Sequence, residues 1–169
     1  MFTRILDVLE KILRVLASCF FAVMVFSISY QIVLRYAFAE ANAWSEELAR
    51  YSFVWLVMLA GSVGTRRARH MNIDFFLNKL PYPLKFAVEM AMRALALLFF
   101  VILGYKGADL SQMTMLQNST GLEIPMGYVY VAIPVGAASM ILFTLEDTWN
   151  IFWNLLRKSP QRQEVADGA

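Results

Sequence analysis

The stretch that decides the fold is VLASCFFAVMVFSISYQIVL, which runs from Val15 to Leu34. These 20 residues carry no charge, and Arg14 and Arg35 bound them. A helix needs about 20 apolar residues to cross the hydrocarbon core of a bilayer, so this stretch predicts a transmembrane helix. The A-x-A pattern of Ala37–Ala39 resembles a signal-peptide cleavage site. The apolar run is longer than a signal-peptide core of about 7–15 residues, and we therefore expect it to be retained.

A second long run, Ile124–Leu145, has 22 residues without a charge and predicts another span. Pro125 suits the first turn of a helix, where a missing N–H costs no hydrogen bond. Pro134 interrupts the run, because it cannot donate to the carbonyl four residues earlier. We expect a structural kink there.

Two shorter runs complete the set of spans. Tyr51–Thr65 has 15 uncharged residues and reaches spanning length if residues 44–50 form the outer turns, where Glu46 can pair with Arg50. Ala94–Tyr105 has only 12 uncharged residues. The long side chains at its two ends, Arg93 and Lys106, can extend to opposite interfaces.

The sequence therefore predicts an all-α membrane protein with four transmembrane helices, at about 15–34, 45–65, 90–108 and 124–145. Between the second and third spans, apolar residues from Ile73 to Leu80 recur at helical spacing, which predicts a short amphipathic helix at about 72–80 on the cytoplasmic side. We expect one membrane domain over residues 1–158 and a disordered cytoplasmic tail over 159–169.

The composition narrows the function. Of 169 residues, 59% are hydrophobic and 17% are charged, against about 25% charged in a soluble domain. A net charge of +2 disfavours nucleic-acid binding. The single histidine, His70, and the single cysteine, Cys19, disfavour a haem site, a multi-histidine metal site and a catalytic pair. We expect no enzyme activity, no cofactor and no metal.

The positions of the basic residues predict the orientation. Eleven Lys and Arg residues fall on the side of the two termini and three on the other side. The positive-inside rule therefore places both termini in the cytoplasm. Glu89 can form an i,i+4 pair with Arg93, which itself falls at the edge of a span.

The spans offer packing surfaces and no evident transport path. Ionisable residues facing a path at membrane depth are typical of transporters that work alone, and the three longer uncharged runs contain none in the useful pKa range. Small residues four apart favour close helix packing, namely Ala60 with Gly64, Gly61 with Thr65, and Gly104 with Ala108. Two alternatives remain, the membrane anchor of a quinone-linked oxidoreductase and a self-sufficient small exporter.

Two strings resemble a known family. The first is WSEELARY at Trp44–Tyr51, continued by Phe53, Trp55 and Leu56 and by His70, Ile73 and Asp74. The second is GLEIPMGYVY at Gly121–Tyr130, continued by Ile133, Pro134 and Gly136. With the four-span layout, the chain resembles the small DctQ-like or SiaQ-like membrane subunit of tripartite ATP-independent periplasmic (TRAP) transporters over about residues 10–155. Glu123 departs from the family pattern, which suggests a small or apolar residue there.

The resemblance implies a non-catalytic subunit in the inner membrane of a Gram-negative bacterium. It would brace a large elevator-type subunit that holds the sodium and substrate sites. It would also help to dock a periplasmic binding protein that delivers an organic acid, such as sialic acid or a C4-dicarboxylate. The candidates for this docking rim on the outer side are Arg35, Glu40, Trp44, Glu46, Glu47, Arg50, Lys106, Asp109 and Glu123. Trp44 is equally typical of an interfacial anchor.

Overall fold

The computed structural model describes residues 2–38, 42–67 and 82–158. The elements are α1 (Phe2–Ala37), α2 (Ala43–Arg67), α4 (Tyr82–Met113), the 3-10 turn η2 (Thr114–Leu116), α5 (Gly127–Tyr130) and α6 (Ala132–Lys158). These ranges are helical apart from the loops and one isolated β-bridge, so the all-α prediction is confirmed. The expected interfacial helix at 72–80 and the tail at 159–169 lie outside the described residues.

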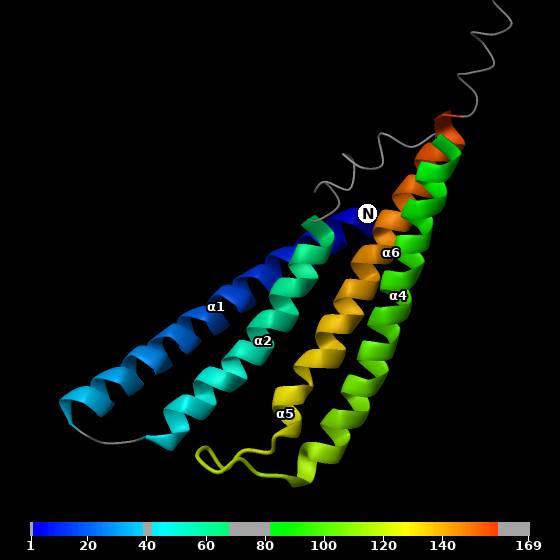
Figure 1. Cartoon of the computed structure of the whole chain (residues 1–169). Helices are drawn as coiled ribbons and strands as arrows, with labels where there is room; N and C mark the ends of the chain where they lie inside the picture. The colour runs from blue at the N-terminus through cyan, green and yellow to red at the C-terminus, as the bar shows by residue number, and fades with distance from the viewer. Residues whose placement is uncertain (1, 39–41, 68–81, 159–169) are drawn as a thin grey trace, which may run out of the picture.

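The helices stand side by side in a row, in the order α1, α2, α6, α4 (Figure 1). Each long helix packs mainly on its neighbours in that order, and α5 continues α6 towards the loop that follows α4. The row is narrow where α1 begins and opens towards the loop between α4 and α5 (Figure 1). We call the first end the charged end and the second the loop end.

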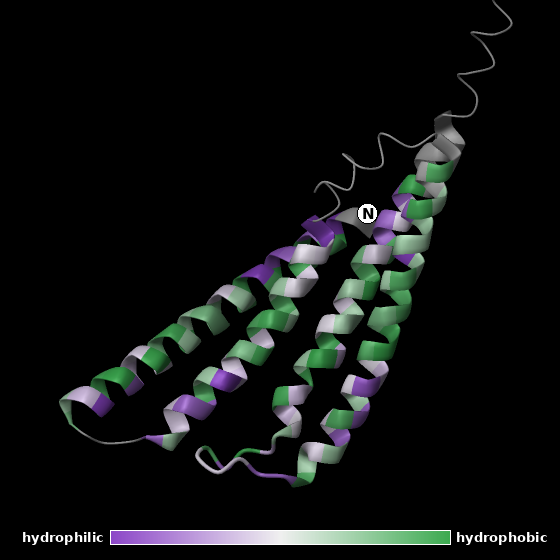
Figure 2. Ribbon diagram, in the orientation of Figure 1, coloured by the Kyte–Doolittle hydropathy of each residue, from purple (hydrophilic) through white to green (hydrophobic). Residues whose placement is uncertain are grey.

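Four helices are long and apolar enough to span a membrane, as expected: Arg4–Ala37, Ala43–Arg67, Ala87–Leu116 and Gly127–Ile151. The first and third extend well beyond the uncharged runs. Acidic and basic residues four apart, Glu10 with Arg14 and Glu89 with Arg93, pair in these extensions and support the helix there. Figure 2 shows the result, a polar charged end followed by apolar helix.

The last span differs from the expected bounds at its start. Helix begins at Gly127, because residues 117–126 form a tight loop in which Met126 N–H donates to the Gln117 carbonyl at 2.8 Å. The expected interruption occurs at Val131, between α5 and α6. Pro134 has no N–H for the carbonyl of Tyr130, which accounts for the break.

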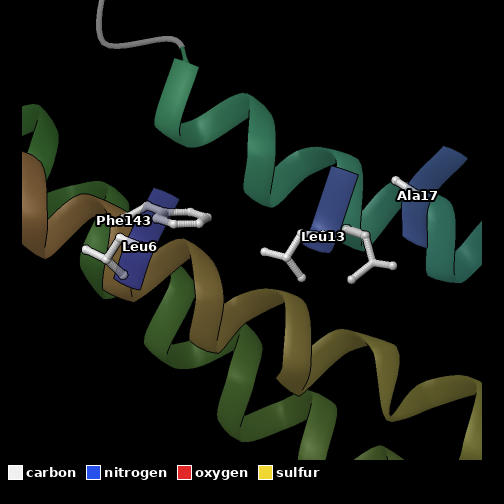
Figure 3. Packing of buried hydrophobic residues seen from close by; sticks show 5 residues of the cluster. Leu6, Leu13, Ala17 and Phe143 are labelled. Atoms are coloured by element: carbon white, nitrogen blue, oxygen red, sulfur yellow. The ribbon is translucent and has the colours of Figure 1, made fainter. Parts of the chain in front are cut away.

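A small apolar core lies near the charged end, where α1, α2 and α6 meet. Leu6 and Leu13 of α1, Leu59 of α2 and Phe143 of α6 are almost fully buried. Figure 3 shows Leu6 beside the Phe143 ring, with Leu13 and Ala17 following along α1. The described part of α4 contributes no buried apolar side chain. The core therefore joins three helices, and α4 is attached at the edge of the row.

Candidate functional site

Arg66, in the last turn of α2, is the centre of a buried ionic cluster at the charged end. Its side chain is 8% exposed. The guanidinium donates to both carboxylate oxygens of Glu146 on α6, at 3.1 and 3.2 Å. It also donates to Glu10 at 2.9 Å, to Asp7 at 2.6 Å and to the Leu6 carbonyl at 2.9 Å, all on α1. One side chain thus holds three helices together.

Two further arginines complete the cluster. Arg67 and Arg14 both donate to Oε1 of Glu10, Arg67 at 3.2 Å. The Arg66 guanidinium carbon lies 5.3 Å from the centre of the Phe143 ring, within the range of a cation–π contact. Three carboxylates and three guanidinium groups therefore balance, and the cluster is placed directly over the apolar core.

A second pair extends this charged layer to α4. Arg93 donates to Asp147 of α6 at 3.2 Å and to Glu89 of α4 at 3.4 Å. The i,i+4 contact between Glu89 and Arg93 is the one the sequence suggested. Because Asp147 follows Glu146, the two ion-pair systems lie at the same level of the row. All four long helices are thus connected at the charged end.

Halfway along the row, α2 and α6 approach closely through small residues. The Ser62 hydroxyl lies 2.7 Å from the Ser139 hydroxyl and donates to the Gly136 carbonyl at 3.0 Å. A Cβ added to Gly136 would lie 2.9 Å from the Met58 Cβ, which explains why this position has no side chain. Both hydroxyls are buried and bonded, so they line no open path.

At the loop end, Glu47 in the first turns of α2 binds the loop between α4 and α5. Its carboxylate accepts bonds from the hydroxyls of Ser119 and Thr120, both at 2.7 Å. It also accepts the backbone N–H groups of Gly121 at 3.0 Å and Leu122 at 3.1 Å. Glu47 is buried, so the structure differs here from the expectation of an exposed rim charge.

The loop held by Glu47 is compact and lies directly on the start of α2. Ser119 N–H donates to the Ile124 carbonyl at 3.0 Å, which closes the loop. A Cβ on Gly121 would lie 3.0 Å from backbone atoms of Trp44, so only glycine fits against α2 here. Glu123 adopts a left-handed conformation with φ 53° and is exposed. The departure from the family pattern thus falls at the tip of a rigid turn.

The other candidate rim residues fall into three groups. Glu46 and Arg50 form the expected exposed pair at 3.2 Å, and Trp44 packs on Tyr30 of α1 with ring centres 5.7 Å apart. Arg35 is exposed at the end of α1. Glu40 lies outside the described residues. Lys106 and Asp109 are exposed on α4, one to two helical turns before its end.

The candidate packing residues divide between inner and outer faces. Gly61 faces Met140 of α6, with half-buried Thr65 one turn further along, and Gly104 faces Ala137 of α6, with half-buried Ala108 beside it. Ala60 and Gly64 point away from every described helix, and the space around Gly64 is open. Sequence reasoning missed Gly107, where an added Cβ would lie 2.5 Å from Ile133 Cγ2.

Sequence reasoning also missed the charged-end cluster. Asp7, Glu10, Glu146 and Asp147 flank the apolar runs and read as ordinary solvated charges, and Arg66 read as part of a basic cytoplasmic loop. The available signal was the acidic pair just after the last uncharged run, opposite basic residues just after the second. Within the described ranges, no three His, Cys, Asp or Glu residues come together as metal ligands.

The chain is similar to known transport proteins. Residues 24–153 match the family of tripartite ATP-independent periplasmic transporters, DctQ component. The sialic acid TRAP transporter small permease protein SiaQ of Vibrio cholerae is 28% identical over 160 residues, covering 92% of this chain and 88% of the relative. The C4-dicarboxylate TRAP transporter small permease protein DctQ of Rhodobacter capsulatus is 35% identical over 57% of this chain and 44% of the relative.

A third relative is much longer than this chain. The isethionate TRAP transporter permease protein DctMQ of Oleidesulfovibrio alaskensis is 26% identical over 73% of this chain, which is 21% of the relative. Proteins of this kind are components of transporters and not enzymes, as expected, and the four long apolar helices agree with a multi-pass inner-membrane protein. The chain belongs to the DctQ family and is the small permease subunit of a TRAP transporter.

Proposed function

We propose that this subunit conducts nothing itself and is a static brace for a large membrane subunit. The observation that carries the proposal is the row of helices, which is one helix thick and encloses no space between layers (Figure 1). The buried charges at Arg66, Glu146 and Glu47 are all engaged in contacts between elements. A path for an ion or an organic acid would need free polar groups facing a cavity at membrane depth.

Pairing with a large subunit is supported by the much longer DctMQ permease, in which a segment similar to this chain makes up about a fifth of the protein. The assembled transporter would take up an organic acid together with sodium. Sialic acid and C4-dicarboxylates are the candidate substrates, because the similar small permeases belong to transporters named for them. The charged end would lie in the cytoplasm, on the side of the eleven basic residues.

The loop end would dock the periplasmic binding protein. The exposed charges of Arg35, Glu46, Arg50 and Glu123 lie there, with Trp44 beside them. Glu40 belongs to the same proposal by its position in the sequence. Charges at the rim of an interface chiefly affect the rate of encounter and the choice of partner. The loop bound by Glu47 would give this surface a fixed shape.

Reconstitution tests the brace directly. Proteoliposomes containing this chain alone should accumulate none of the candidate organic acids under an inward sodium gradient. Liposomes that also contain the large subunit, with the binding protein added outside, should accumulate the substrate. Uptake by this chain alone would overturn the proposal and support a self-sufficient transporter.

Charge reversal tests the docking surface. Glu46→Lys and Glu123→Lys should slow uptake when the binding protein is limiting and have little effect when it is saturating, because encounter is then no longer limiting. Arg4→Glu, at the exposed start of α1, reverses a charge at the opposite end and is the matched control. Equal rates for the variants and the wild type under both conditions would remove these residues from the surface.

A further inference from the structure

The outward face of α4 is the most unusual surface of the chain. On its inner side, Gly104 and Gly107 pack on α6, and Ser111 donates to the Gly127 carbonyl at 3.0 Å. The opposite side forms one stripe of exposed residues that nothing in the described chain covers: Leu95, Phe99, Ile102, Lys106, Asp109 and Met113. Because α4 is last in the row, this stripe faces away from the other helices (Figure 1).

The stripe has the spacing of a helix-packing seam. Its members alternate four and three residues apart along the helix. This is the repeat by which two helices pack side chains into each other's grooves over a long distance. Its apolar members are between 52% and 68% exposed, so the seam is available to a partner.

Lys106 and Asp109 lie within the membrane core if the Arg93 layer marks one boundary. Lys106 is 13 residues and Asp109 is 16 residues beyond Arg93. At about 1.5 Å per residue these are about 20 and 24 Å, against a core of about 30 Å. The contacts to α6 agree, because Gly107 faces Ile133, which is also 13 residues from Glu146. Figure 2 shows polar colour returning in this part of α4.

An ionisable pair facing lipid at this depth is costly. Lysine can extend towards the interface, but the short aspartate side chain cannot. No acid or base among the described residues lies within ion-pair distance of either group, and the nearby ring for Lys106 is that of adjacent Tyr105, at 5.6 Å. The other edge helix provides the contrast, because α1 presents no charge between Val15 and Leu34. Lipid suffices to cover α1, whereas α4 needs polar partners.

We propose that the α4 seam is the surface on which a transmembrane helix of the large subunit packs. That helix would place a carboxylate against Lys106 and a hydrogen-bond donor against Asp109. This inference rests on the proposed pairing with a large subunit and specifies the face. It also separates Lys106 and Asp109 from the rim that would dock the binding protein.

Photocrosslinking in the assembled transporter tests the face. A benzophenone amino acid replaces Phe99 of the seam or, as a control of the same residue type, Phe26 of α1; the two are 58% and 72% exposed. The Phe99 probe should form a covalent product with the large subunit, and the Phe26 probe should not. A product at Phe26 alone, or a Phe99 product between two copies of this chain, would overturn the assignment. If the large subunit co-purifies without any Phe99 product, the face is wrong while the pairing stands; if it never co-purifies, both fail.

An exchange of the two charges tests the polar partners. In Lys106→Asp combined with Asp109→Lys, the charges could still pair with each other three residues apart on α4. If they serve only each other, assembly is unchanged and the proposal fails. If they face complementary groups on the large subunit, the amount of co-purified large subunit should fall by about tenfold, the usual scale of a lost polar contact between membrane helices. The control exchange of Glu46 with Arg50, in Glu46→Arg and Arg50→Glu, should leave assembly unchanged.

Discussion

The charged end and the loop end are held together by different means. At the charged end, Arg66 joins α1, α2 and α6, and Arg93 joins α6 to α4. At the loop end, Glu47 of α2 binds the loop that follows α4, and α1 contacts α2 through stacked aromatic rings. The row is correspondingly narrow at the first end and open at the second (Figure 1).

This difference indicates how the row serves a larger assembly. Ion pairs between helices fix the charged end as one body, whereas the loop end keeps exposed faces and free charges for other proteins. The loop itself is nevertheless rigid, since a single carboxylate accepts four hydrogen bonds from it. Stability and recognition are thus separated along the membrane normal.

The largest effect should follow loss of Arg66. In Arg66→Met, Glu146 loses its guanidinium partner while its side chain is 3% exposed. Removing one member of a buried ion pair costs about 3–5 kcal/mol, and the free energy of unfolding in mild detergent should fall by that amount. Arg67→Met is the control, because this side chain is 59% exposed and should contribute about 0–1 kcal/mol. Equal losses in the two variants would contradict a buried clamp at the charged end.

A smaller effect is expected where α4 meets α6. In Gly107→Ala, the new methyl group would overlap Ile133, and overpacking of this kind costs about 1–3 kcal/mol. Gly64→Ala adds the same group into open space and should be neutral or stabilising by up to about 1 kcal/mol, because alanine favours the helix. Thermal unfolding in detergent distinguishes them. Effects of the same sign would show that the close approach at Gly107 is not required.

The smallest global effect, and a sharp local one, is expected at Glu47. Glu47→Ala removes the acceptor for the Gly121 and Leu122 N–H groups. Hydrogen exchange at these two amides should quicken strongly while the unfolding midpoint changes little, because the charged end remains intact. Glu46→Ala, next to it on the exposed face, should leave both amides protected. Unchanged exchange in Glu47→Ala would mean that other contacts hold the loop.

The spans followed from the sequence because each requires only a long apolar run. Helix ends were less predictable. Charged residues such as Glu10 and Arg14 extend α1 through local pairing, and the loop pairing of Ser119 with Ile124 delays the start of α5. Both depend on contacts that a hydropathy pattern does not contain.

The polar sites could be predicted only in part. Glu46–Arg50 and Glu89–Arg93 are local pairs, so their spacing revealed them. Arg66 and Glu146 are 80 residues apart, and Glu47 lies 72 residues from Ser119. Such pairings depend on the order of helices in the row, which the sequence does not display. For the same reason Glu47 resembled its exposed neighbour Glu46.

The central claim is that the row does not change shape while the transporter works. A disulfide between α2 and α6 tests it, with Ser62→Cys and Ser139→Cys in a Cys19→Ser background, because the two serine hydroxyls are 2.7 Å apart. In the complete reconstituted transporter, uptake should be equal with the disulfide formed and with it reduced. Loss of uptake on oxidation, restored by reduction, would contradict a static brace.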